Sequence, residues 1–329
     1  MPRRDLVWFG LFAFVYVPLC VTLEASVPCR GGPDEGDHYL YIRALGDTCR
    51  LPIRAPVYAG RLGGGDRVSR QIQHPPLYYL VGAVVYRLAK PWGPAATWKA
   101  VRGLNIALGV AALYLLLLTA RLVLSRRRDL SFAPVVLCAL VPASAYLSCV
   151  VTNETGAAPC TSAVQYALAR VIWLGPSRRR LAALALLLGL GGLTKYTVLV
   201  WLPACLCVVP VVVWRARRSW RLVAEGVTTI LTVPLAVCGG WFVRNYLLYG
   251  VPVFRNVISP PLFPGGLPQI AALPDELLLS CCHLIYRSIP MAWTPYWLIA
   301  QTPGWTRLLC RGSFVITAPI ALGAVFRAV

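Results

Sequence analysis

The run PDEGDHYLY at positions 33–41 is the part of the sequence richest in groups that can do chemistry. It places three acids and a histidine within five residues, in a chain that has only 12 acidic residues. If the run is helical, Asp34 and His38 lie one turn apart and share a face. The adjacent carboxylates of Asp34 and Glu35, beside an imidazole, can serve as a general base or bind a divalent cation. A solvated helix start with a capping carboxylate is the alternative.

Two further polar residues stand beside breaks in apolar segments. His74 belongs to QIQHPPLYYL (71–80), where two prolines end any preceding helix and fix the start of the next one. Glu154 belongs to VTNETG (151–156) and is one of only two acids between 130 and 270. We expect His74 to lie at the membrane interface, where Tyr78 and Tyr79 after it fit either a binding role or an aromatic belt.

Two cations lie at the ends of apolar segments. Lys195, in GLTKYT (192–197), is one of only three lysines. An ionisable side chain at membrane depth is a functional hypothesis by default, and the alternative is that it extends to the interface as a snorkelling lysine. Arg244, in GGWFVRNYLLYG (239–250), precedes Asn245 and could hold a phosphate, although a positive charge at a helix end is common.

The composition indicates the class of protein that must position these groups. Of the 329 residues 58% are hydrophobic and 13% are charged, and the mean hydropathy is +0.65. Soluble domains have about 45–50% apolar and about 25% charged residues, so the water-soluble globular class is excluded. No GxGxxG, Walker, GxSxG or HExxH motif supports nucleotide binding, serine hydrolysis or zinc proteolysis. We therefore expect an all-α, polytopic integral membrane protein.

The net charge of +20 concerns membrane topology rather than nucleic acid binding. The basic residues form short clusters between apolar stretches, and such clusters mark cytoplasmic ends of transmembrane helices. Clusters at 126–128, 178–180 and 215–218 alternate correctly with pairs of apolar stretches. About eight transmembrane helices are predicted, since each needs about 20 apolar residues. The stretches are 6–23, 103–124, 131–151, 156–174, 181–193, 197–214, 222–243 and 311–327.

This topology makes residues 1–329 a single membrane domain with two large extracytoplasmic loops, 24–102 and 244–310. The first of these loops carries the acidic run. Within it, the apolar segment 76–89 has 14 residues, which is too short to cross a hydrocarbon core of about 30 Å. We expect 76–89 to be an interfacial or re-entrant helix, because a true span there would invert every later basic cluster.

The N-terminal apolar stretch and two cysteines leave alternatives open. Residues 6–23 follow Arg3 and Arg4, which fits a retained anchor with its N-terminus inside. A cleaved signal peptide is the alternative, although no clean small-residue cleavage site follows. Cys29 and Cys49 flank the acidic run and could form a disulfide in an oxidising compartment.

Taken in order, these motifs resemble the GT-C glycosyltransferases. The similarity rests on a first helix, an Asp-Glu pair in the first outer loop, HPPLYYL, an Asn-acid pair at an outer turn, GLTKYT and WFVRNYLLYG, and it spans residues 1–255. It is greatest to the branch of protein O-mannosyltransferases and lipid A aminoarabinose transferases. Members are polytopic helical enzymes that move a sugar from a polyprenyl-phosphate carrier to an acceptor on the extracytoplasmic or lumenal side.

The resemblance implies roles for individual residues. Asp34 matches the first-loop acid proposed as catalytic base, and Glu35 is its neighbour. Lys195 and Arg244 match positions where basic residues would hold the donor phosphate. His38, His74, Glu154 and Asn245 would then bind substrate. The expected partners are the bilayer, a polyprenyl-phosphate-linked sugar and an acceptor glycan, lipid or protein.

The expected reaction is an inverting displacement at the extracytoplasmic face, with transfer to a hydroxyl or an amine. No cofactor is required by the residues, and a divalent cation at Asp34, Glu35 and His38 is the one candidate. The main rival is a membrane carrier or transporter of lipid-linked sugars, which would not explain the acids gathered in one loop. An inactive partner subunit is a third hypothesis.

Overall fold

The computed structural model describes residues 3–53 and 71–249, and every regular element in these residues is a helix. The all-α membrane class predicted from the sequence is confirmed. The chain divides into two compact units, one formed by Met1–Ala139 with Leu147–Phe254 and the other including Leu140–Tyr146. The predicted stretch 311–327 and nearly all of the predicted loop 244–310 lie outside the described residues, so the single-domain assignment stays a prediction.

Four helical segments in the described residues are long and apolar enough to cross a membrane. They are α1 (Arg3–Ser26), α4 (Pro94–Val123), the 3-10 turn η3 (Tyr196–Val200) joined to α9 (Trp201–Arg217), and α10 (Trp220–Tyr249). Helices α7 (Asn153–Trp173) and α8 (Arg178–Thr194) fall outside this length and hydropathy class. The number of spans therefore stays a prediction.

Two predicted boundaries were wrong, and a third predicted stretch is bent in its middle. Helix α4 begins at Pro94 rather than near 103, because Gly93 at φ 92° ends the preceding turn and proline suits a first helical position. The stretch 131–151 is divided into α5 (Ala133–Ala139) and α6 (Pro142–Ser148), since Pro142 cannot continue the hydrogen bonding of α5. Helix α10 continues to Tyr249, so Arg244 lies inside its last turns.

Two short helices occupy the first predicted outer loop. Helix α2 (Glu35–Thr48) follows the acidic run, and α3 (Leu77–Ala89) is the short apolar segment. Helix α3 packs against α2, α4 and α8, and buries Tyr78, Tyr79 and Tyr86. Thirteen residues of helix rise about 20 Å, so α3 is too short to cross a membrane alone.

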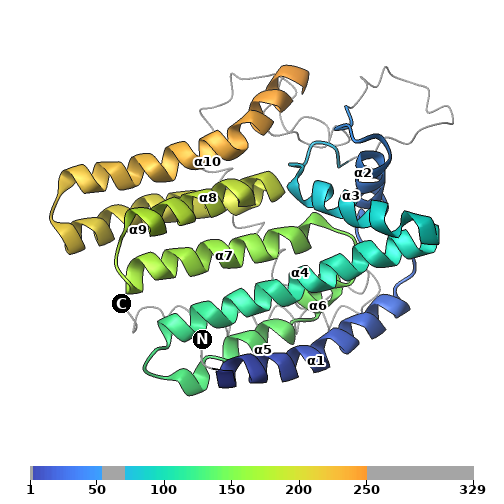
Figure 1. Cartoon of the computed structure of the whole chain (residues 1–329), viewed down its shortest axis with the longest axis horizontal. Helices are drawn as coiled ribbons and strands as arrows, with labels where there is room; N and C mark the ends of the chain where they lie inside the picture. Colours follow the sequence, from blue (N-terminus) through green and yellow to red (C-terminus); the bar gives the residue numbers. More distant parts are fainter. Residues whose placement is uncertain (1–2, 54–70, 250–329) are drawn as a thin grey trace, which may run out of the picture. The chain divides into compact units, whose positions relative to one another are not determined.

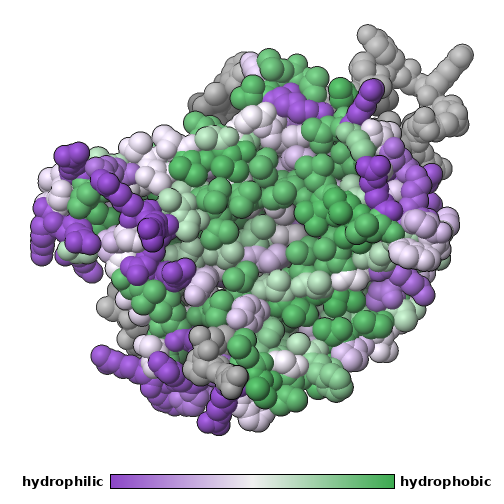
Figure 2. Space-filling model, viewed as in Figure 1, coloured by the Kyte–Doolittle hydropathy of each residue, from purple (hydrophilic) through white to green (hydrophobic). Residues whose placement is uncertain are grey.

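The longer helices lie side by side in Figure 1, with α4 against α7, α7 against α8, and α8 against α10. Hydrophobic side chains cover the middle of these helices in Figure 2, and hydrophilic ones gather at their ends. Apolar residues of α7, α8, α9 and α10 form the larger core cluster. Close approach of α8 to α10 depends on Gly189, because a Cβ there would lie 2.7 Å from Val237 Cβ.

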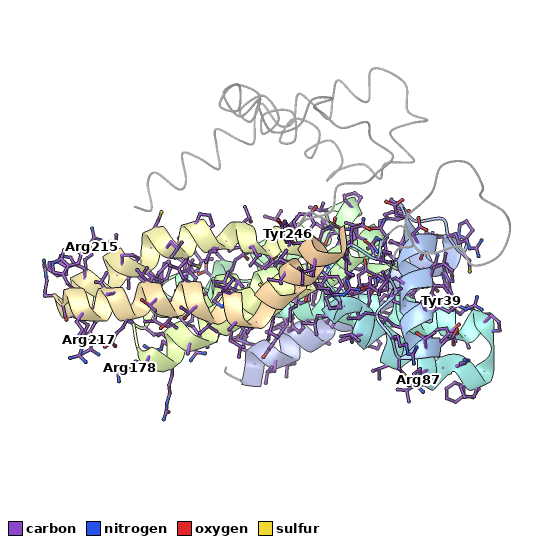
Figure 3. The ribbon with its side chains drawn as sticks, turned by 90° about the horizontal axis from the view of Figure 1, so that it is seen from above. Tyr39, Arg87, Arg178, Arg215, Arg217 and Tyr246 are labelled. Carbon is purple, nitrogen blue, oxygen red and sulfur yellow. The ribbon has the colours of Figure 1, made fainter. Side chains whose placement is uncertain are left out.

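The basic clusters lie together at one end of these helices. Arg178, Arg215 and Arg217 are at the left of Figure 3, and Tyr39 of α2 is at the opposite end. A 3-10 turn, η2 (Arg128–Leu130), carries the end of the 126–128 cluster. The common end agrees with the predicted topology, and the side of the membrane that it faces stays a prediction.

Candidate active site

Polar residues from four segments of the chain meet where α2, α3, α7 and α8 come together. We define the polar cluster as Asp34, His38, His74, Glu154 and Lys195. The sequence separates them by up to 161 positions (195 minus 34). Ring contacts, an ion pair and charge effects link them through Tyr79 and Tyr196, as described below.

Two histidines form the middle of the polar cluster. The rings of His38 and His74 lie 6.2 Å apart, and Nδ1 of His38 is 2.8 Å from the Tyr79 hydroxyl. His74 stacks on Tyr196 at 6.2 Å, and its Nδ1 is buried with no hydrogen-bond partner among the described residues. One ring nitrogen of His74 is therefore buried and unpaired among the described residues.

Both histidines are neutral at pH 7. Burial lowers the pKa of His38 to about 3, and the charges of His74 and Lys195 add to this effect. Burial lowers the pKa of His74 to about 4, and the charge of Lys195 again contributes. The histidines can therefore orient a substrate by hydrogen bonding, while Lys195 supplies positive charge.

Lys195 and Glu154 form an ion pair across the start of α7 and the end of α8. Lys195 is 7% exposed and follows the last residue of α8 in an extended conformation. Its side chain is buried and paired rather than exposed, and the functional role of Lys195 stays a prediction. The Glu154 side chain is 51% exposed, so this carboxylate is the accessible half of the pair.

Asp34 lies at the start of α2 with its side chain exposed. Its backbone has a left-handed φ of 52°, and its carbonyl accepts hydrogen bonds from the backbone amides of Asp37 and His38. Its carboxylate makes no capping bond, so the alternative of a capping acid is wrong. Burial raises the pKa of the Tyr79 hydroxyl, and the charges of neighbouring tyrosines, Glu154 and Asp34 add to the effect.

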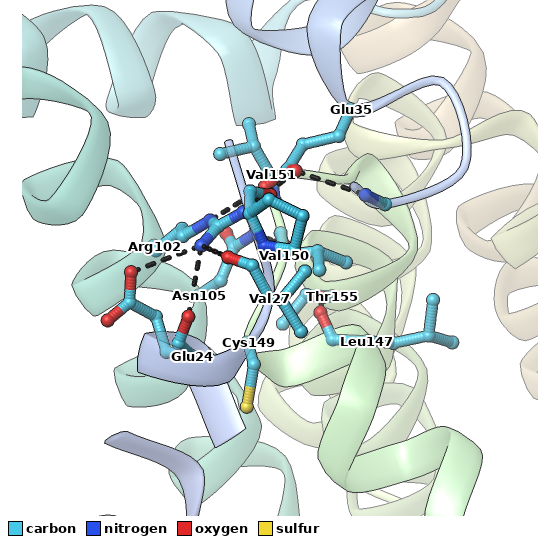
Figure 4. A network of polar contacts seen from close by, with 12 residues as sticks. Glu24, Val27, Glu35, Arg102, Asn105, Leu147, Cys149, Val150, Val151 and Thr155 are labelled. Atoms are coloured by element: carbon cyan, nitrogen blue, oxygen red, sulfur yellow. Dashed lines mark hydrogen bonds and ion pairs between the residues drawn. The ribbon is translucent and has the colours of Figure 1, made fainter. Parts of the chain in front are cut away.

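Glu35 has a very different environment from Asp34, although the two are adjacent. It is fully buried, and it accepts hydrogen bonds from Nε and Nη2 of Arg102 at 2.8 and 2.9 Å (Figure 4). The backbone amides of Val151 and Gly32 also donate to its carboxylate, at 2.9 and 3.2 Å. With both oxygens engaged, Glu35 is suited to holding the site in place, and the geometry gives no support to its predicted catalytic role.

Arg102 is a buried residue beside the site that the sequence reasoning missed. It is 1% exposed, and besides Glu35 it binds the Glu24 carboxylate at 3.2 Å. Its guanidinium also donates to the backbone carbonyls of Glu24, Val27 and Pro28. Arg102 thereby joins α4 to the end of α1 and the start of α2, and its position directly before the apolar stretch 103–124, with Lys99 one turn earlier, gave no distinctive signal in the sequence.

Asn105, one turn after Arg102, was also missed. Its amide nitrogen donates to the backbone carbonyl of Val150, and its amide oxygen accepts a hydrogen bond of 3.0 Å from the Tyr78 hydroxyl. These bonds connect α4 to α3 and to the segment before α7. Arg102 and Asn105 of α4 therefore form buried polar contacts that hold together the segments carrying the polar cluster.

Arg244 and Asn245 contact the chain on either side of residues 54–70. Arg244 donates to the backbone carbonyl of Pro52 at 3.3 Å and lies 4.7 Å from the Trp241 ring centre. Asn245 donates to the carbonyl of Gln73 at 3.3 Å, one residue before His74. The structure thus places Arg244 and Asn245 at the rim of the polar cluster, and no hydrogen bond joins Arg244 to Lys195 in the described residues.

The alternative of a divalent cation at Asp34, Glu35 and His38 does not fit this geometry. Glu35 is bound to Arg102, and His38 faces Tyr79. Within residues 3–53 and 71–249, no three His, Cys, Asp or Glu side chains converge as a metal site. Cys29 and Cys49, which could have formed a disulfide, are both free.

Comparison with known proteins finds a similar fold among solved structures. No protein-family model and no curated protein matches the sequence. Among solved structures, ArnT from Cupriavidus metallidurans bound to undecaprenyl phosphate is similar, with a TM-score of 0.50 and 17% sequence identity. The apo form of the same protein gives a TM-score of 0.45 and 18% identity.

The similarity to ArnT extends over 73% of this chain. The chain in turn spans 42% of the length of the undecaprenyl phosphate complex. At this level of identity the likeness concerns the fold. The resemblance noted in the sequence motifs is confirmed to that extent.

Proposed function

We propose that the protein is a membrane glycosyltransferase that moves a sugar from a polyprenyl-phosphate donor to an acceptor hydroxyl or amine on the extracytoplasmic side. The observation that carries the proposal is the Lys195–Glu154 pair beside two neutral histidines. A buried cation whose counter-ion is half exposed can exchange that counter-ion for an anionic ligand. The ArnT structure of similar fold is bound to undecaprenyl phosphate, which is a ligand of this class.

In the proposed reaction Asp34 acts as the base. Its exposed carboxylate takes the proton from the acceptor hydroxyl, and the acceptor oxygen then bonds to the anomeric carbon of the sugar. The bond from that carbon to the phosphate oxygen breaks, and its electron pair leaves on the polyprenyl phosphate. The configuration at the anomeric carbon is inverted.

Lys195 and Arg244 would stabilise the departing phosphate. Arg244 can bind two phosphate oxygens, whereas Lys195 supplies a compact charge. His74, with its unpartnered Nδ1, would donate to or accept from the sugar. Glu35 and Arg102 would hold Asp34 in position without touching substrate, which assigns base catalysis to Asp34 alone.

The first test measures binding of polyprenyl phosphate alone to the reconstituted protein. Lys195→Met removes the cation and should weaken binding about tenfold or more, the effect of one charge-assisted hydrogen bond. Glu154→Gln removes the competing carboxylate and should strengthen binding. Arg215→Gln, an exposed change at the opposite end of the helices, is the matched control and should have no effect.

The second test measures transfer, using a panel of radiolabelled polyprenyl-phosphate sugars. Asp34→Asn should abolish transfer while phosphate binding and helix content stay at wild-type levels. Wild-type phosphate affinity in both Lys195→Met and Arg244→Gln would refute the proposed binding of the phosphate by these two cations. Normal phosphate binding with no transfer of any sugar by the wild-type protein would instead favour a carrier or an inactive partner subunit.

A further inference from the structure

A second polar site lies at the other end of α1, far from the polar cluster. Asp5, in the first turn of α1, is separated from Glu24 by about 28 Å at about 1.5 Å of rise per residue. A cavity of about 890 Å³ opens beside it, between α1, the end of α4, η2 and the start of α5. The two ends of α1 are therefore separated by roughly the thickness of a hydrocarbon core.

Asp5 and Arg121 both line this cavity, and each has one polar atom buried just beneath its surface. Asp5 is 5% exposed, and its Oδ1 accepts a hydrogen bond from Nη2 of Arg121. Its Oδ2 and the Nε of Arg121 are buried with no hydrogen-bond partner among the described residues. Buried polar atoms in proteins are almost always satisfied, so an acceptor and a donor side by side indicate a missing group. A hydroxyl can satisfy both atoms, because it donates and accepts at once.

The charges and the apolar wall around these atoms restrict the ligand further. Arg4, Arg121 and Arg128 line the cavity with Asp5 and Asp129, which gives a net charge of +1 (3 minus 2). Arg4 and Arg128 are exposed, so their guanidinium groups are free to bind an anion. The remaining wall is apolar and aromatic, and Trp8 and Leu11 in it are half exposed. The lining residues are Trp8, Leu11, Phe12, Phe132 and Val136, besides the charged ones.

We propose that this cavity binds the headgroup of phosphatidylglycerol. The phosphate would bind Arg4 and Arg128, a glycerol hydroxyl would donate to Asp5 and accept from Arg121, and an acyl chain would lie along the apolar wall. Phosphatidylethanolamine fits less well, because its ammonium group donates but cannot accept from Nε of Arg121. Polyprenyl phosphate provides the anion but no neighbouring hydroxyl.

The test is native mass spectrometry of the full-length protein in detergent, with defined lipids added one at a time. Phosphatidylglycerol should be retained about tenfold more than phosphatidylethanolamine, phosphatidylcholine or polyprenyl phosphate. Arg128→Gln should reduce that retention about tenfold, as expected for the loss of one charge-assisted hydrogen bond. The Arg128 side chain is exposed. The backbone carbonyl of Arg128 accepts hydrogen bonds from Nη1 of Arg121 and from the hydroxyl and amide of Ser131, and these do not depend on its side chain, so folding should persist.

Two further variants keep the result decisive. If Arg128→Gln is not recovered as folded protein, Arg4→Gln serves instead, since it removes an exposed arginine from the same cavity and should reduce retention of phosphatidylglycerol similarly. Arg215→Gln neutralises an arginine of another basic cluster and should retain phosphatidylglycerol at the wild-type level. Equal retention of phosphatidylglycerol and phosphatidylethanolamine would overturn the proposal. So would an equal loss in Arg215→Gln and Arg128→Gln, or stronger retention of polyprenyl phosphate. None of these outcomes depends on the proposed transferase activity.

Discussion

Replacing Arg102 by methionine should destabilise the protein more than any other loss of a single charge in the described residues. The change would leave the Glu35 carboxylate fully buried without its cation. Removing one partner of a buried ion pair costs about 3–5 kcal/mol. The carbonyls of Glu24, Val27 and Pro28 would also lose their donor, so we expect the upper part of this range.

The assay is thermal unfolding of the purified protein in detergent, with Arg43→Gln as the control. Arg43 pairs with Asp47 in α2 at 3.4 Å, but its side chain is 59% exposed, and an exposed pair contributes about 0–1 kcal/mol. At about 2–4 °C per kcal/mol, Arg102→Met should lower the midpoint of unfolding by about 10 °C or more, and Arg43→Gln by less than about 4 °C.

A double-mutant cycle separates the ion pair from general damage to packing. Glu35→Gln alone should also be costly, because it leaves Arg102 without its charged partner. The double variant Arg102→Met with Glu35→Gln should cost about 2–3 kcal/mol less than the sum of the two single changes. Additive effects would show that Arg102 does not stabilise Glu35 through its charge, and an Arg102→Met variant as stable as Arg43→Gln would refute the buried pair itself.

Three other predictions follow from features of the described residues. The depressed pKa of His38 means that the unfolded chain takes up a proton near pH 6.5 while the folded one does not until about pH 3. Stability should therefore fall as the pH drops from 7 to 5, and His38→Gln should reduce that fall by about 2 kcal/mol in unfolding experiments (1.5 pH units at about 1.36 kcal/mol each). An unchanged fall would contradict the prediction. Gly189→Ala should cost about 1–3 kcal/mol by overpacking α8 against α10, whereas Gly240→Ala, with no atom within 4 Å of its new Cβ, should be neutral or stabilising. A cysteine in place of the exposed Ser125, in a variant without the 12 native cysteines, should react with an impermeant reagent only from the cytoplasmic side. Labelling from outside would mean that 76–89 crosses the bilayer.

Hydropathy and charge clusters predicted the helical class and the common end of the basic clusters because both depend on composition over many residues. The exact boundaries of the helices depend on single residues, whose effect is lost when hydropathy is averaged over many positions. Gly93 and Pro94 move the start of α4, and Pro142 divides a continuous apolar stretch. Such residues act through local backbone geometry, which a hydropathy pattern over a long apolar stretch does not detect.

The candidate site was predictable as a set of residues but not as a set of contacts. His38, His74, Glu154 and Lys195 stood out because polar groups are rare in this chain, and the fold does gather them. That Lys195 pairs with Glu154 could not be read from a separation of 41 residues. The different roles of Asp34 and Glu35 were equally hidden, because the partner of Glu35 lies 67 residues away in α4.

The Arg102 network also bears on the order in which the chain can assemble during synthesis. Its members come from the end of α1, the start of α2, α4 and the residue before Thr152, so it closes only after more than 150 residues have been made. Contacts between distant parts of a chain form late, because the intervening loop must first be closed. Until Val151 emerges, Glu35 and Arg102 have only each other, the end of α1 and the segment that joins α1 to α2. We expect a nascent chain arrested before α7 to leave the first loop open to proteolysis, and one arrested after α7 to protect it.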